Sequence, residues 1–200
     1  MGHSRNLDLK VNLAGLILAA GPSTRLGRPK QLLVHREKTL IERVVTLAAE
    51  FCGAGVVVVT GSCHNQVFAE LQGTTAETVY NPEWRNGMSS SIRAGLPHID
   101  SACAGVMLML CDQPAVSRAD YRALVEFWIS HPDCIVAAEY GGTRGVPAIF
   151  PATYRDELMS LNGDEGGRSI IASAERVSFV KLPNAQFDID TPDDLRHLDT

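Results

Sequence analysis

Short, continuously apolar runs alternate along the chain with stretches of helical period. Seven such runs predict β-strands at residues 13–20, 55–60, 78–80, 105–111, 134–139, 148–150 and 178–182. They are apolar throughout rather than alternating, as expected of parallel strands that are buried on both faces. The pattern therefore favours a mostly parallel sheet over an antiparallel one.

Polar residues with capping-box spacing mark where two helices begin. Thr39 with Glu42, and Ser117 with Asp120, each precede apolar residues at helical spacing. Strands that alternate with helices predict an α/β fold, namely a single-domain, doubly wound, Rossmann-like sheet with helices on both faces. We expect one domain over residues 13–200. Residues 1–12 read as an N-terminal tail, in which residues 2–5 fit an expression remnant.

Composition and charge narrow the classes of function. A formal net charge of -5 over 200 residues argues against a general nucleic-acid binder, which would carry a basic face. The longest apolar runs have strand length, short of the ~20 residues that span a bilayer, so no membrane partner is expected. The five cysteines form no CxxC pair, and the N-terminus lacks a signal-peptide pattern. We therefore expect a reducing, cytoplasmic location.

A basic, glycine-containing loop follows the first predicted strand. It holds Gly21, Gly27, Arg25, Arg28 and Lys30. Ligands of doubly wound sheets bind beyond the carboxyl ends of the strands, and glycines let backbone N–H groups approach an anion closely. The spacing matches neither the P-loop nor the dinucleotide-binding GxGxxG motif. The loop predicts a polyphosphate site in preference to a solvated basic surface.

Aspartates mark two further segments. Asp112 ends the fourth predicted strand, where a carboxylate can hold Mg²⁺, although a turn or cap aspartate would look the same. Asp188 and Asp190 alternate just before Thr191-Pro192, which predicts the start of a last helix. Alternation puts both carboxylates on one face of an extended segment, available to a metal held by Asp112. Three glycine-rich segments, at residues 86–91, 145–147 and 163–168, are singly no more than turn signatures.

Together these motifs resemble the molybdenum cofactor cytidylyltransferase group of the nucleotidyltransferase superfamily, which is related to molybdopterin-guanine dinucleotide synthase. The resemblance runs from about Leu13 to Leu198 and rests on LAAGPSTRLGRPK, NPEWRNGMSSSIRAGL, LMLCDQP, RGVPAIF, GDEGGRSII and DIDTPDDL. It implies a Mg²⁺-dependent nucleotidyltransferase that moves CMP from CTP to a phosphorylated acceptor, molybdopterin or the molybdenum cofactor, and releases pyrophosphate. In this superfamily the LAAG form, here at residues 18–21, goes with CTP.

The resemblance also implies a role for each matching position. Catalysis would depend on Lys30, Arg25 and Asp112, and Mg²⁺ would be held by Asp112 and Asp190. The nucleotide would be bound by Leu18, Ala19, Ala20, Gly21, Ser23, Arg25, Lys30, Gly87, Ser91 and Asp112. The acceptor would be bound by Gln113, Pro114, Gly145, Val146, Pro147, Gly166, Gly167 and Arg168.

One departure from the family pattern concerns the acceptor. Val146 stands where members that accept molybdopterin usually carry a histidine. The same chemistry on a sugar or polyol phosphate, or with another NTP, therefore stays open. So does a non-catalytic protein that carries the cofactor to a molybdenum-containing oxidoreductase. The intact cations and aspartates favour catalysis, because a carrier need not keep metal-binding carboxylates.

Overall fold

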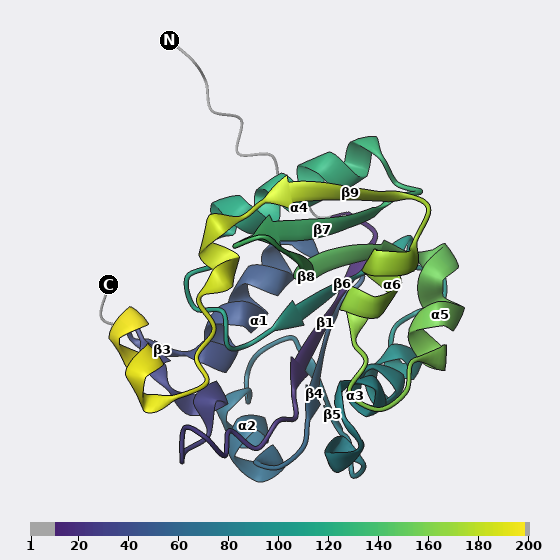
Figure 1. Ribbon diagram of the computed structural model, residues 1–200. Helices are drawn as coiled ribbons and strands as arrows, with labels where there is room; N and C mark the ends of the chain where they lie inside the picture. Colours follow the sequence, from purple (N-terminus) through teal and green to yellow (C-terminus); the bar gives the residue numbers. More distant parts are fainter. Residues whose placement is uncertain (1–10, 199–200) are drawn as a thin grey trace.

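The computed structural model describes residues 11–198, which fold around a seven-stranded sheet (Figure 1). The strand order is β5-β4-β1-β6-β8-β7-β9. β8 is antiparallel to both of its neighbours, and the other paired strands run parallel. The strands are β1 (Leu13–Ala19), β4 (Val56–Thr60), β5 (Glu77–Tyr80), β6 (Gly105–Leu110), β7 (Ile135–Tyr140), β8 (Thr143–Pro151) and β9 (Val177–Lys181). The predicted mostly parallel sheet is confirmed.

Each strand lies on one of the predicted apolar runs. β1 and β4 are buried at every position, as the lack of alternation indicated. The prediction for β8 was too short, because this strand also takes in Gly145, Val146 and Pro147, which we expected in a loop. Its register against β7 shifts between Ala137 and Ala138. Such a bulge is where a central strand can accommodate a proline, which has no N–H to donate.

Helices cover both faces of the sheet, as predicted (Figure 1). They are α1 (Leu40–Phe51), α2 (His64–Glu70), α3 (Met88–Gly95), α4 (Arg118–Ser130), α5 (Arg155–Ser160) and α6 (Gly167–Ser173). The two predicted capping boxes are confirmed at the starts of α1 and α4. The sequence did not indicate α2, α5, α6 or the small β2 (Val34–His35) and β3 (Lys38–Thr39) hairpin.

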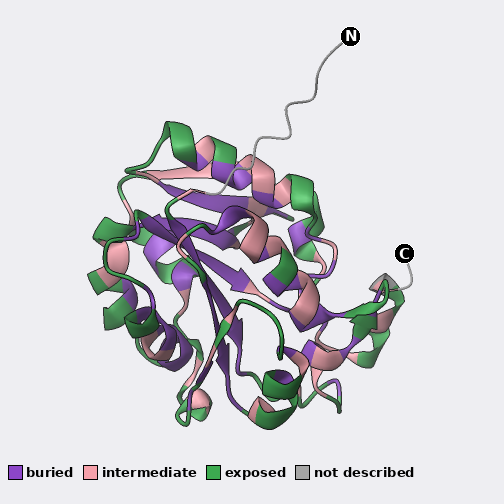
Figure 2. Ribbon diagram, turned by 180° about the vertical axis from the view of Figure 1, so that it is seen from behind, coloured by how far each residue is buried: buried purple, intermediate pink, exposed green. Residues whose placement is uncertain are grey.

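The buried residues form a core layer on each side of the sheet (Figure 2). One layer packs α1, α2 and α4 against β1, β4, β6 and β7, and its members include Val44, Val67 and Leu124. The other packs α3, α5 and α6 on the opposite face, and its members include Ile92, Leu158 and Ile170. Two such layers hold the sheet rigid, so the loops at its carboxyl edge project from a fixed platform.

The last element within the described residues is a short 3-10 helix, η6 (Pro192–His197), where we expected a regular helix. The carboxylate of Asp194 accepts hydrogen bonds from the backbone N–H groups of Asp190 and Thr191 at 3.1 and 2.8 Å, which fixes the start of this helix. A third apolar cluster joins Ile189 and Leu195 to Leu26, Leu33 and Leu40. The C-terminal segment is thereby packed against the basic loop near the N-terminus.

The first described residues already belong to this fold. Val11 forms a parallel bridge with Cys52, and the Asn12 side chain donates to the Ala102 carbonyl at 3.0 Å. The remainder of the expected N-terminal tail lies outside the described residues. Across residues 11–198, every helix is too short or too polar to cross a membrane.

Candidate functional site

A cleft of about 490 Å³ opens at the carboxyl ends of β1 and β6. The predicted nucleotide-binding residues that line it are Leu18, Ala19, Ala20, Gly21, Arg25, Lys30, Gly87, Ser91 and Asp112. Ser23 lies behind the lining, where its Oγ accepts from the Lys30 backbone N–H at 3.1 Å. Residues from three distant parts of the chain therefore meet where the fold class predicts a ligand.

Lys30 is the centre of the charged side chains in this cleft. Its Nζ lies 2.5 Å from Asp112 Oδ2 and 3.0 Å from Asp190 Oδ1. Arg25 reaches the other oxygen of Asp190 at 2.8 Å. The Ile189 N–H also donates to the Asp112 carbonyl at 2.9 Å, which fixes the end of β6 beside residues 188–190. The two carboxylates predicted to share a metal thus contact one ammonium group.

The surroundings give the charged groups of this network different proton affinities. Burial alone would lower the pKa of Lys30, but Asp112 and Asp190 raise it above its ordinary value. Burial opposes the shift at Asp190 too, yet Lys30 and Arg25 hold the pKa of its carboxyl below the usual range. Desolvation, together with the charge of Asp112, raises the pKa of Asp188 to about 6, although part of its surface is exposed. The carboxyl of Asp190 therefore stays ionised to a lower pH than that of Asp188.

The carboxylates fit a divalent cation completed by substrate oxygens. Asp112 Oδ1 is buried and has no hydrogen-bond partner, so one oxygen of this carboxylate is free for a ligand. Within residues 11–198 no group of three His, Cys, Asp or Glu side chains could hold a metal by themselves. Mg²⁺ commonly binds through one or two carboxylates plus phosphate and water oxygens. Asp112 and Asp190 would supply the carboxylates, and the substrate and water would supply the remaining oxygens.

Gln31 braces the loop of residues 20–30, which we call the phosphate loop. Its side chain is 1% exposed, and its Nε2 donates to the carbonyls of Ala19 and Gly21 at 2.9 Å each. Ser23 adopts a positive φ of 52°, and its carbonyl accepts from the N–H groups of Leu26 and Gly27. The loop is therefore held by its own hydrogen bonds before any ligand arrives.

The wall opposite the phosphate loop is made by the start of α3. Asn81 Nδ2 donates to the hydroxyls of Ser90 and Ser91 at 2.9 and 3.1 Å, all three residues being buried. Ser90 in turn donates to the Gly87 carbonyl at 2.8 Å. The glycine- and serine-rich motif, which by itself indicated only a turn, thus forms the first turn of a helix.

The predicted acceptor residues meet beside the cleft, around β8. Gln113 is buried, and its Nε2 donates to the carbonyls of Ala185 and Val146 at 2.9 and 3.4 Å. A methyl group on Gly145 would lie 3.3 Å from both the Arg168 Nε and the Tyr140 hydroxyl. Burial raises the pKa of Tyr140, and the neighbouring Arg168 opposes this shift. Arg168 is thereby placed over β8 at Gly145, next to the bulge that contains Pro147.

Three of the predicted acceptor residues also have structural contacts. The carbonyl of the buried Pro114 accepts from Arg43 of α1 at 3.3 Å. A methyl group on Gly166 would meet Met88 Sδ at 2.5 Å, and one on Gly167 would meet the Phe150 ring at 2.8 Å. These glycines let α6 pack closely on α3 and β8.

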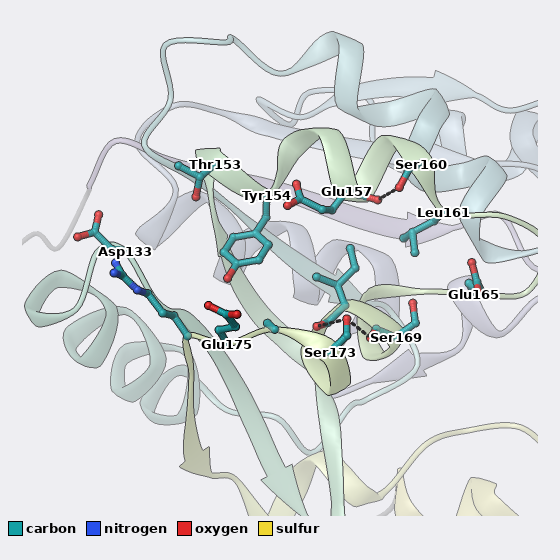
Figure 3. Close-up of a pocket in the computed structure, with 13 residues that line it drawn as sticks. Asp133, Thr153, Tyr154, Glu157, Ser160, Leu161, Glu165, Ser169, Ser173 and Glu175 are labelled. Atoms are coloured by element: carbon teal, nitrogen blue, oxygen red, sulfur yellow. Dashed lines mark hydrogen bonds between the residues drawn. The ribbon is translucent and has the colours of Figure 1, made fainter.

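A second, larger hollow of about 850 Å³ lies at the surface between α5 and α6 (Figure 3). Hydroxyl and acidic side chains surround it, with Tyr154, Glu157, Ser169 and Glu175 among them. It contains none of the predicted site residues. Its rim shares only the loop between α5 and α6 with the nucleotide cleft.

Seven residues that line the nucleotide cleft were not among the predicted site residues, namely Pro22, Gln31, Trp84, Met88, Leu110, Cys111 and Asp164. Trp84 and Met88 lie in the motif at residues 81–96, and Asp164 lies in the glycine-rich motif at residues 163–168. Their position within these motifs was the signal in the sequence that could have identified them as site residues. Which of these residues face the cleft depends on how α3 and the α5–α6 loop pack.

Comparison with known proteins identifies the class to which this fold and site belong. Residues 15–177 match the MobA-like NTP transferase domain. The chain is 25% identical over 182 residues to the molybdenum cofactor cytidylyltransferase of Escherichia coli strain K12, covering 90% of this chain and 91% of that protein. It is 34% identical over 170 residues to nicotine blue oxidoreductase of Paenarthrobacter nicotinovorans, covering 78% and 79%. The crystal structure of Rv0371c from Mycobacterium tuberculosis H37Rv in complex with manganese has a TM-score of 0.74 and 30% identity, covering 93% and 97%.

The chain belongs to the MobA-like NTP transferase family. It is an enzyme of the nucleotidyltransferase type, similar to molybdenum cofactor cytidylyl- and guanylyltransferases. The expected family and fold class are confirmed.

Proposed function

We propose that this protein transfers CMP from CTP to a phosphorylated acceptor of the molybdopterin type, with Mg²⁺ as cofactor, and releases pyrophosphate. The observation that carries the proposal is the position of Lys30. Lys30 is the last residue of the phosphate loop, and its ammonium group joins Asp112 and Asp190 at the carboxyl edge of the sheet. A cation flanked by two carboxylates, one with a free buried oxygen, suits a metal–triphosphate complex better than an uncharged ligand.

The residues around this group would align the reactants and stabilise charge. An oxygen of the acceptor phosphate attacks the α-phosphorus, the new P–O bond forms, and the bond to the β-phosphate oxygen breaks in line with it. Lys30 would neutralise charge on the α-phosphoryl oxygens, while Arg25 would hold the departing pyrophosphate. Mg²⁺ held by Asp112 and Asp190 would supply further neutralisation of phosphate charge. A phosphate nucleophile is already ionised at neutral pH, so no general base is needed.

The base is assigned to the floor of the cleft, and the acceptor is assigned to the residues beside the cleft around β8. Ala19, Ala20 and Ser91 are buried and small, so backbone amides rather than side chains would read the base. Amides donate to cytosine O2 and N3, which favours CTP over GTP and ATP. Arg168, beside Gly145 and Tyr140, would bind the acceptor phosphate, since a guanidinium fork matches phosphate oxygens. Gln113 and Pro147 would shape the rest of this side.

Cellular context follows from the same proposal. All five cysteines are free, which fits a reducing compartment such as the cytoplasm. A molybdenum-containing oxidoreductase would be the protein that receives the product.

A second candidate function comes from the relative named nicotine blue oxidoreductase, at 34% identity over 79% of its length. A reductase would bind a nicotinamide dinucleotide in the same cleft and would not need two carboxylates on a metal. The Lys30 network therefore favours transfer. Oxidation of NADH or NADPH with nicotine blue, without pyrophosphate release, would support the reductase instead.

The test is a matrix of nucleotides and acceptors with the purified protein and Mg²⁺. CTP, GTP, ATP and UTP are each combined with molybdopterin, a sugar phosphate or a polyol phosphate, and pyrophosphate release is measured. Release with CTP and molybdopterin alone is the expected result. Pyrophosphate release with another acceptor would support nucleotidyl transfer but would identify a different acceptor. Absence of release under every combination would reject the transferase.

A further inference from the structure

The loop between α5 and α6 reaches the nucleotide cleft through Asp164. This residue lines the cleft together with Gly87, Met88 and Lys30. Ser89 fixes the loop in place, because its backbone N–H and its hydroxyl both donate to the Gly163 carbonyl, at 3.2 and 2.8 Å. Residues 163–164 are therefore a fixed wall of the cleft rather than a free surface turn.

Gly87 allows the two walls to approach this closely. Its φ is 91°, a conformation that favours glycine. A Cβ on Gly87 would lie 2.3 Å from the Gly163 carbonyl oxygen and 2.5 Å from Asp164 Oδ1. Glycine at residue 87 thus has a specific consequence, because it brings the Asp164 carboxylate against the start of α3.

The charges in the cleft decide which part of a nucleotide can meet this carboxylate. Triphosphate oxygens would be repelled by it and would be drawn to Lys30 and Arg25 instead. The buried floor at Ala19, Ala20 and Ser91 suits the base. Asp164 is exposed, so it stands at the rim, where the ribose that connects base and phosphates must pass.

We propose that Asp164 accepts a hydrogen bond from the ribose 2′-hydroxyl of the bound NTP and makes the site selective for ribonucleotides. A carboxylate that accepts from the 2′-hydroxyl is a known means of ribose recognition in other nucleotide-binding folds. The inference rests on the proposed function only in taking an NTP as the ligand. It names a specificity-determining residue in a loop that is otherwise assigned to the acceptor.

The test measures equilibrium binding of CTP and of 2′-deoxy-CTP by calorimetry in the presence of Mg²⁺, beside pyrophosphate release. The parent protein should bind CTP roughly 10- to 100-fold more tightly, since hydrogen bonds to charged groups have this worth. Asp164→Ala should weaken CTP binding to the level of 2′-deoxy-CTP and leave the deoxynucleotide almost unaffected. Asp164→Asn, which keeps one acceptor oxygen, should fall between the two.

Glu165→Gln is the matched control. Glu165 is the next carboxylate in the same loop, but it accepts from the Asn162 N–H at 3.1 Å and does not line the cleft. This variant should keep the full ribose preference. Equal binding of the two nucleotides by the parent, or an unchanged ratio in Asp164→Ala, would overturn the inference. So would a ratio that changes between CTP and UTP instead, because Asp164 would then read the base. Ribose selectivity without pyrophosphate release would leave Asp164 assigned and reject the transferase.

Discussion

The part of the site that we assign to the nucleotide and the part that we assign to the acceptor, which we call the nucleotide side and the acceptor side, are held together by different forces. On the nucleotide side, Lys30 Nζ contacts two carboxylates within 3.0 Å, and buried Gln31 braces the phosphate loop. On the acceptor side, Arg168 lies over Gly145 through packing. The first arrangement is specified by charge, and the second mainly by the shape of β8 and α6. This difference implies that substitutions on the two sides should impair the activity in different ways.

The largest effect is expected at Asp112. Asp112→Ala removes the carboxylate with the free buried oxygen, so we expect kcat to fall about 1,000-fold, which is roughly 4 kcal/mol of transition-state stabilisation. Pyrophosphate release at saturating CTP and Mg²⁺ measures it, with circular dichroism to check folding. Asp188→Ala is the comparison and should be much milder. Turnover of Asp112→Ala within a few-fold of the parent would remove Asp112 from the metal site.

Lys30 should come next and should act on the chemical step. Lys30→Ala should lower kcat by roughly 100-fold and change KM for CTP less, because its charge matters most as the phosphoryl group transfers. Arg25→Ala should act more evenly on binding. Arg28→Ala, on the same loop, provides the control and should stay within two-fold. Small, equal effects of all three would identify the loop as a solvated basic surface.

Gln31 tests whether the phosphate loop is preorganised. Gln31→Leu leaves the carbonyls of Ala19 and Gly21 without their donor, which should lower the free energy of unfolding by about 2 kcal/mol. Urea denaturation measures this loss. Gln72→Leu, at an exposed glutamine on the surface, should change it little. An unfolding free energy equal to the parent's would show that the loop does not depend on this brace.

On the acceptor side, a substitution should change the KM of one substrate only. Arg168→Ala should raise KM for the acceptor roughly tenfold, about the worth of a charge-assisted hydrogen bond, and leave KM for CTP unchanged. Arg176→Ala, beside the outer hollow of Figure 3, is the matched arginine control. A rise in KM for CTP instead would place Arg168 on the nucleotide side.

The smallest effect is expected in base choice. Ala20→Gly enlarges the buried floor of the cleft by one methyl group, which should relax the preference for CTP over GTP by a few-fold. The ratio of kcat/KM values for the two nucleotides, at saturating acceptor, checks it. A ratio that stays constant would mean that the volume at Ala20 does not select the base.

The same contrast explains what could be predicted from the sequence. Strands follow from apolar runs, and the starts of α1 and α4 follow from capping boxes, because these signals lie within a few residues of each other. The basic, glycine-containing loop could be predicted for the same reason, because its residues are neighbours in the sequence. The roles of Gln31 and Asp164 could not be predicted. The side chain of Gln31 donates to the Ala19 carbonyl at the start of the loop, and Asp164 contacts Gly87 from a distant part of the chain, so both contacts depend on the folded structure.

The acceptor side shows the limit most clearly. The motif around Gly145 read as a loop because it contains a glycine and a proline, yet the bulge in β8 absorbs both within the sheet. Gly167 is predicted to contact the acceptor, and its close packing against Phe150 is by itself a sufficient reason for a glycine there. Local composition cannot distinguish a glycine needed for close packing from one needed for a ligand.

The most direct test of the account is pyrophosphate release by the purified protein with molybdopterin and each NTP, with Mg²⁺ and again after its removal by a chelator. The account predicts release with CTP, far less with GTP or ATP, and none without the metal ion. Release from GTP or ATP at a kcat/KM equal to that for CTP, or release that persists without the metal, would contradict it.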